Sequence, residues 1–259
     1  MIEIVTITCE NDFDLCLYQL KSMEKFLEPC TINVVINEED IEPYKTKIPY
    51  SKIHTIRVWS QFDILQRKAP HFNGWVNQQI LKLIIPLDCD YVVLDCKDIF
   101  IKTTKLEDLK RRHRQKHPNP LKTKPWTKWF PPTIDILYKH YKTRINVKEI
   151  NSIQTPRYIR KTVVSEIPKI WGDRSKFIKW FGKFGMPSEF ILYDCLEQFT
   201  HSERNKKYLP REIVAFWYPE QLDFTKINDN TRIVKIHRRI YNDIDLQDKI
   251  KKWLNEVLQ

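Results

Sequence analysis

The sequence predicts an α/β fold with a mostly parallel sheet, and three observations support this. Short β-branched apolar runs alternate with segments of helical periodicity through residues 2–100. The chain has 259 residues, of which 42% are hydrophobic, so it can bury a full core. No apolar run has the length of a membrane span.

The first two elements are a strand and a helix. Residues 2–8 are rich in β-branched side chains and predict a strand. Residues 13–27 place apolar side chains at spacings of three and four, which predicts an amphipathic helix. We expect Asn11 or Asp12 to cap it.

The alternation continues up to an acidic strand end. Residues 31–36 and 54–58 predict two further strands, and residues 74–85 predict a helix. Residues 91–94 form a strand without a polar side chain, which ends at Asp95. Ligands of parallel α/β sheets bind beyond the carboxyl ends of strands, so residues 8–12 and 95–98 are the expected binding region.

The second half of the chain carries weaker signals. Its predicted elements are an apolar helix, a late strand and a terminal helix, at residues 190–199, 232–236 and 244–258. The rest of residues 130–209 mixes helix and loop. Without a linker of domain-boundary character, we expect one domain over residues 1–259.

Composition excludes several classes of protein. Only four glycines occur, and none belongs to a GxGxxG or P-loop motif, which argues against P-loop ATPases, kinases and ordinary dinucleotide dehydrogenases. The six cysteines have no zinc-ligand spacing and predict buried thiols in a reducing compartment. The N-terminus lacks the basic and apolar regions of a signal peptide, so we expect a cytoplasmic protein.

Three segments together resemble an uncharacterised bacterial and viral family of GT-A-like glycosyltransferases. The first is the helix with Gly74-Trp75, Gln78-Gln79 and Lys82-Leu83, and the second is the strand end Leu94-Asp95-Cys96-Lys97. The third is Ser188-Glu189-Phe190 followed by Leu192-Tyr193, and Thr155-Pro156 also fits. The resemblance covers residues 2–193.

The resemblance implies a GT-A-like, Rossmann-like fold and transfer of a sugar from a nucleotide sugar. Residues 1–100 would bind the donor, and residues 101–259 would form the acceptor side and a helical, loop-rich C-terminal part. It implies Asp95 and Glu189 as catalytic residues, with Glu189 facing the acceptor. The implied donor-binding residues are Thr8, Asn11, Gln78, Gln79, Lys82, Lys97 and Asp98. Ser188-Glu189 also fits a plain helix N-terminus, and Gln78 with Lys82 also fits a solvated helix face.

The sequence leaves the use of a metal open. The usual GT-A motif is Asp-x-Asp, but Lys97 stands at its second position. Either Asp95, Asp98 and His237 hold Mn²⁺ or Mg²⁺, or the Lys97 ammonium takes over the charge of the metal. For the lone His237, an ordinary surface or packed position is the plainer interpretation.

Residues 102–128 hold ten basic and two acidic side chains, much of the excess behind the net charge of +11. The candidate acceptor-binding residues are Arg111, Arg112, Arg114, Lys122, Lys124, Trp126 and Trp129. Basic side chains contact phosphates and aromatic rings stack on bases, so DNA with a hydroxylated base is the sharpest acceptor hypothesis.

Other interpretations of these residues stay open. The stretch also fits a solvated charged loop, or peripheral contact with an anionic membrane surface. The rival functions are transfer to a surface glycan or lipopolysaccharide, and non-catalytic nucleic-acid binding on a GT-A scaffold.

Overall fold

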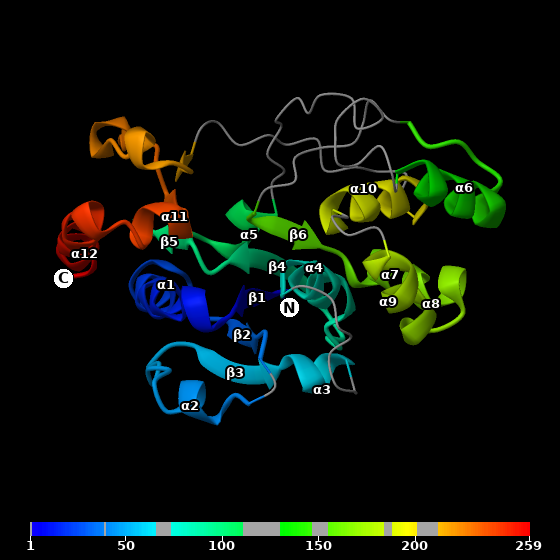
Figure 1. The fold of residues 1–259 in the computed structure, drawn as a ribbon, viewed down its shortest axis with the longest axis horizontal. Coiled ribbons are helices and arrows are strands. Elements are labelled where there is room, and N and C mark those ends of the chain that lie inside the picture. The colour runs from blue at the N-terminus through cyan, green and yellow to red at the C-terminus, as the bar shows by residue number, and fades with distance from the viewer. Residues whose placement is uncertain are drawn as a thin grey trace.

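The computed structural model describes residues 2–38, 40–65, 74–110, 130–146, 155–183, 188–200 and 212–259. Its main sheet has five strands in the order β3-β2-β1-β4-β6 (Figure 1). The first four strands run parallel, and β6 pairs antiparallel with β4. Their bounds are β1 (Ile2–Thr8), β2 (Thr31–Ile36), β3 (Thr55–Ser60), β4 (Asp90–Asp95) and β6 (Arg157–Ile159). The predicted α/β fold with a mostly parallel sheet is therefore confirmed.

Helices cover both faces of this sheet because successive apolar side chains along its strands point to opposite faces, so both faces are apolar. Ile4 and Val92 pack with residues of α1 (Phe13–Phe26) in one core cluster. Val5 and Val93 point to the other face and pack with residues of α4 (Gly74–Ile84). The sheet is thus the middle layer of three.

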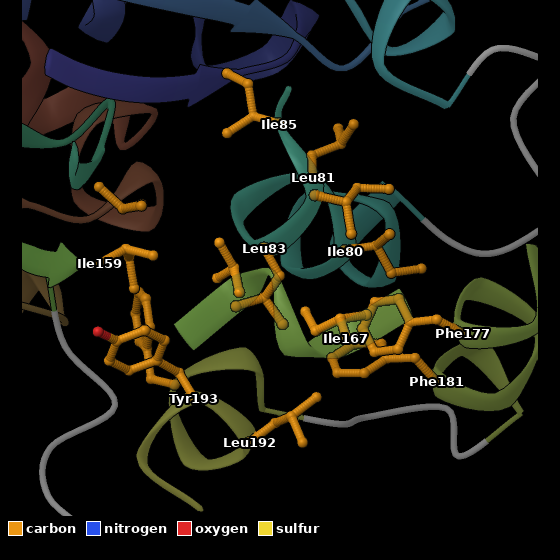
Figure 2. Packing of buried hydrophobic residues seen from close by; sticks show 14 of the residues in the cluster. Ile80, Leu81, Leu83, Ile85, Ile159, Ile167, Phe177, Phe181, Leu192 and Tyr193 are labelled. Atoms are coloured by element: carbon orange, nitrogen blue, oxygen red, sulfur yellow. The ribbon is translucent and has the colours of Figure 1, made fainter. Parts of the chain in front are cut away.

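The layer that contains α4 is thickened by further helices. Figure 2 shows Ile80 and Leu83 of α4 packed with Phe177, Phe181 and Tyr193 from later segments. These helices are α6 (Phe130–Tyr141), α7 (Lys161–Val164), α8 (Glu166–Trp171), α9 (Arg174–Gly182) and α10 (Glu189–Thr200). The predicted helix at 190–199 is confirmed as α10.

A second, three-stranded sheet has the order β5-β8-β7. It packs on the C-terminal helices in a third core cluster that includes Val234, Ile236, Ile250 and Leu254. Its elements are β5 (Asp98–Phe100), β7 (Ile213–Phe216), β8 (Ile233–Ile236), α11 (Arg238–Tyr241) and α12 (Ile244–Leu258). The late strand and the terminal helix were predicted, whereas β5 and β7 were not.

The remaining described elements are short. They are η1 (Glu10–Asp12), α2 (Glu42–Lys45), α3 (Gln61–Leu65), α5 (Leu106–Leu109), η4 (Pro219–Gln221) and η5 (Phe224–Lys226). All six cysteines are free thiols. Asp12 is the N-cap residue of α1, but its side chain makes no capping hydrogen bond. The capping expectation is wrong in this respect, because the Asp12 carboxylate is engaged by basic side chains instead.

Candidate active site

Three strand ends meet at one edge of the molecule. The parallel register of β1 and β4 sets Ile7 beside Asp95, so both strands end together. The backbone N–H of Ile236, at the end of β8, donates to the carbonyl oxygen of Lys97 at 3.3 Å. The turn after β4 is fixed from α1, where Gln19 Nε2 donates to the carbonyl oxygens of Asp95 at 2.5 Å and Asp98 at 3.0 Å.

Asp95 lies between two buried lysines at this edge. Lys82 Nζ is 3.2 Å from Asp95 Oδ1, and Lys235 Nζ is 3.4 Å from Oδ2. Burial opposes the charge of Asp95, but Lys82, Lys235 and Lys97 outweigh it and hold the pKa of Asp95 far below its usual range. The Asp95 side chain is 33% exposed, so an ionised carboxylate faces solvent here.

Lys82 connects Asp95 to the start of α10. Its Nζ also donates to Glu189 Oε1 at 3.0 Å, and the Lys82 and Glu189 side chains are only 6% and 4% exposed. With the Gln79 amide oriented by its hydrogen-bonding surroundings, so that its nitrogen rather than its oxygen faces this carboxylate, the nitrogen donates to both carboxylate oxygens, at 2.7 Å to Oε1. Burial raises the pKa of Glu189. Burial also disfavours the Lys82 ammonium, but Asp95 and Glu189 more than compensate and raise the pKa of Lys82.

Asp98 and Lys235 form the floor of the site. The antiparallel pairing of β5 with β8 sets these residues opposite each other, with Lys235 Nζ 3.1 Å from Asp98 Oδ1. Asp98 Oδ2 accepts the backbone N–H of Asp95 at 2.9 Å, and Lys235 donates to Thr155 Oγ1 at 2.6 Å. Asp98 is fully buried, which raises its pKa. This pair is therefore sealed beneath Asp95.

A second ionic group borders the same edge. Asp12 is buried, and its two oxygens face two cations: Lys97 Nζ at 3.4 Å from Oδ2 and Arg238 Nε at 3.7 Å from Oδ1. His237 precedes α11, and its Nδ1 accepts the backbone N–H of Arg239 at 3.2 Å. Burial and the nearby charges of Lys97 and Arg239 lower the pKa of His237.

The structure brings together the two predicted catalytic residues and three of the seven predicted donor-binding residues. Asp95, Lys82, Gln79 and Glu189 are in direct contact, and Asp98 touches Asp95. Three others do not enter this network. Gln78 is half-buried on α4, Thr8 is buried with its hydroxyl donating to its neighbour's carbonyl, and Asn11 is exposed in η1.

The predicted acceptor residues cannot be placed in this site. Arg111, Arg112, Arg114, Lys122, Lys124, Trp126 and Trp129 all lie outside the described residues.

A divalent cation fits this set of side chains poorly. Asp95 already faces Lys82 and Lys235, and Asp98 is sealed against Lys235. Because His237 Nδ1 accepts a backbone N–H, the neutral ring carries its proton on Nε2 and offers no lone pair there. Within the described residues, no group of three or more His, Cys, Asp or Glu side chains is arranged to hold a metal.

Sequence reasoning missed Lys235 and Arg238, and it placed Asp12 in the expected binding region only as a helix cap. A signal existed for Lys235, because it is the single charged residue in the apolar run Ile233–Ile236. A lysine inside a buried strand needs a carboxylate partner, which the sequence alone does not identify.

Among the described helices, none combines the length and the apolar character that a membrane span requires. No curated protein matches the chain.

Among solved structures, the chain is similar to the apo structure of the bifunctional glycosyltransferase WbbM, with a TM-score of 0.53 and 12% sequence identity. That match covers 90% of this chain but only 45% of the WbbM chain, and at this identity it shows a likeness of fold. A family match extends over residues 6–173, and the chain therefore belongs to DUF6492, a family of unknown function.

Proposed function

We propose that this protein is a glycosyltransferase that moves a sugar from a nucleotide-sugar donor to an acceptor hydroxyl. The observation that carries the proposal is Asp95, an ionised and partly exposed carboxylate held by buried lysines at the carboxyl edge of a parallel sheet. This edge is where α/β folds of this type bind nucleotides. The fold likeness to a glycosyltransferase supports the same assignment.

The chemistry needs a group on each side of the transferred sugar. The bond between the anomeric carbon and the diphosphate oxygen breaks, and the acceptor oxygen bonds to that carbon and loses its proton. Asp95 stays ionised at neutral pH because its pKa is so low, so it acts as a hydrogen-bond acceptor for hydroxyl groups of the donor.

Glu189 has two candidate roles. Its raised pKa suits a base that takes the acceptor proton. Its burial and its contact with Lys82 suit a residue that positions Lys82 against Asp95. The two roles differ in effect: loss of a base lowers turnover, whereas loss of a positioning contact weakens donor binding.

The proposal identifies the donor as a nucleotide sugar and does not identify the acceptor. The DNA hypothesis draws on residues 102–128, of which 111–128 fall outside the described part of the chain. No described contact favours DNA, and a surface-glycan acceptor is compatible with the fold likeness. The acceptor class therefore stays a question for experiment.

The test is hydrolysis of nucleotide sugars without an acceptor, with water in place of the hydroxyl. The purified protein is incubated with UDP- and GDP-sugars, and released nucleoside diphosphate is measured. We expect Asp95→Asn to abolish release while the matched variant Asp88→Asn, in an exposed loop residue before β4, keeps it. Full activity of Asp95→Asn would remove this site assignment. Absence of both binding and turnover for every donor would contradict the proposed function.

A further inference from the structure

Two cations at the edge of the site share one buried carboxylate. Lys97 follows β4 and Arg238 begins α11, so they come from distant parts of the chain. Both face Asp12, at 3.4 and 3.7 Å. Asp12 cannot neutralise two cations, so this group keeps one net positive charge. We call Lys97, Arg238 and Asp12 the cation clamp.

The clamp differs from the buried lysines in its access to a ligand. The Lys82 and Lys235 side chains are 6% and 2% exposed, and both are paired with carboxylates of the protein. Lys97 and Arg238 are 20% and 43% exposed. The charge of the clamp also lowers the pKa of Asp95, through Lys97. The clamp therefore lies beside the partly exposed carboxylate that we assign to the donor.

His237 adds a neutral donor to this edge. Burial, together with the neighbouring charges of Lys97 and Arg239, disfavours protonation of the ring and lowers its pKa. The hydrogen bond from Arg239 N–H to Nδ1 fixes the tautomer with the proton on Nε2. An N–H of this kind can donate to a phosphate oxygen.

We infer that Lys97 and Arg238, with His237, bind the diphosphate of the donor and take the place of the divalent cation found in GT-A enzymes of the Asp-x-Asp type. This inference rests on the proposed function. Cations placed at the diphosphate would stabilise the negative charge that develops on it as the sugar leaves. The poor fit of a divalent cation to Asp95, Asp98 and His237 supports the same conclusion, since a metal would be repelled by the ammonium groups already there.

The test is calorimetric titration of the purified chain with UDP and with GDP, in EDTA and again with Mn²⁺. We expect at least one of them to bind in EDTA, with little gain from Mn²⁺. Lys97→Met and Arg238→Met should each weaken that binding about tenfold, as expected for loss of one charge-assisted contact. Binding of the corresponding nucleoside, which lacks phosphate, should change little.

A matched control separates the clamp from general charge. Lys169 is exposed on α8, and among the described residues its ion pair is the local one with Glu166 at 2.6 Å, so Lys169→Met should bind like the wild type. Thermal melting of each variant shows whether it is folded. Binding that requires Mn²⁺ and ignores both clamp variants would overturn the inference and leave the proposed function standing. Absence of nucleotide binding under every condition would overturn both.

Discussion

Lys82→Met removes the ammonium that joins two carboxylates at the candidate active site. Methionine has nearly the same length and keeps the apolar stem of the lysine packed in α4. The change leaves Asp95 and Glu189 without the cation that lies 3.2 and 3.0 Å from them. The perturbation is therefore electrostatic, with little change in packing volume.

The size of the effect follows from how deeply each partner is buried. Removing one member of a buried ion pair costs about 3–5 kcal/mol of unfolding free energy, because an uncompensated charge stays inside. Glu189 is 4% exposed and meets this condition, whereas Asp95 is 33% exposed and keeps Lys235 as a partner. Water screens the Asp95 side, so we expect the lower end, about 3 kcal/mol at neutral pH.

The cost should depend on pH in a definite direction. Burial already raises the pKa of Glu189, and the loss of Lys82 raises it further. A group whose pKa is raised in the folded protein contributes stability that is fully present below its unfolded-state pKa. This stability is lost as the pH rises through the folded-state pKa. Lys82→Met should therefore be less destabilised at pH 5 than at pH 7.5. Urea unfolding at both pH values, with Lys169→Met as the control, measures this.

A second variant tests the explanation itself. In Lys82→Met/Glu189→Gln the buried charge is replaced by a neutral amide, so we expect about 1 kcal/mol or more to be recovered relative to Lys82→Met alone. A loss of unfolding free energy under about 1 kcal/mol in Lys82→Met at both pH values would refute the reasoning, since an unpaired buried carboxylate destabilises the fold by more than that. Simple additivity of the two single variants would refute it as well.

Three further predictions concern catalysis, acid stability and the acceptor. Glu189→Gln should lower transfer turnover about a hundredfold with donor affinity nearly unchanged; a weaker donor affinity with intact turnover would instead leave Glu189 as the residue that positions Lys82. The low pKa of Asp95 contributes stability above its unfolded-state pKa, so the stability difference between the wild type and Asp95→Asn, followed by urea unfolding, should be full at pH 7 and shrink below about pH 4. Reversing Arg111, Arg112 and Arg114 to Glu should weaken duplex DNA binding equally for all sequences in a low-salt anisotropy titration, whereas no binding by the wild type would eliminate the DNA acceptor.

The elements that sequence predicted are those with a clear period or an unbroken apolar run. The strands at 2–8 and 31–36 agree with the structure, and the helix expected at 13–27 ends one residue earlier, at Phe26. β5 and β6 have three residues each, too few to show a period of two. Such strands form because the edge of a neighbouring strand offers unpaired backbone groups, which is information about the fold and not about the segment.

The candidate site divides in the same way. Asp95, Lys82 and Glu189 belong to local motifs that the sequence displays, and the structure sets them in contact. Lys235 reaches Asp95 because β8 pairs with β5 in one register. Arg238 reaches Asp12 because the same strand ends beside the turn after β4. Register between strands far apart in the chain is set by packing of the whole domain, so no local pattern reveals these partners.

A buried ion pair is not in itself a sign of function, and this molecule provides the comparison. Arg157 on β6 pairs with Asp194 on α10, and their side chains are 5% and 1% exposed. That pair is sealed within the protein and joins two elements of the fold. The network around Asp95 is as deeply buried on the lysine side, yet its central carboxylate stays open to solvent. Hydrophobic side chains of similar size would often be at least as stable as buried charges. Lys82 and Lys235 also pair with the buried Glu189 and Asp98, which is a structural role, but that role does not require them to face Asp95 as well. Their contact with a carboxylate that water can reach is explained if that carboxylate must stay ionised and fixed for a ligand.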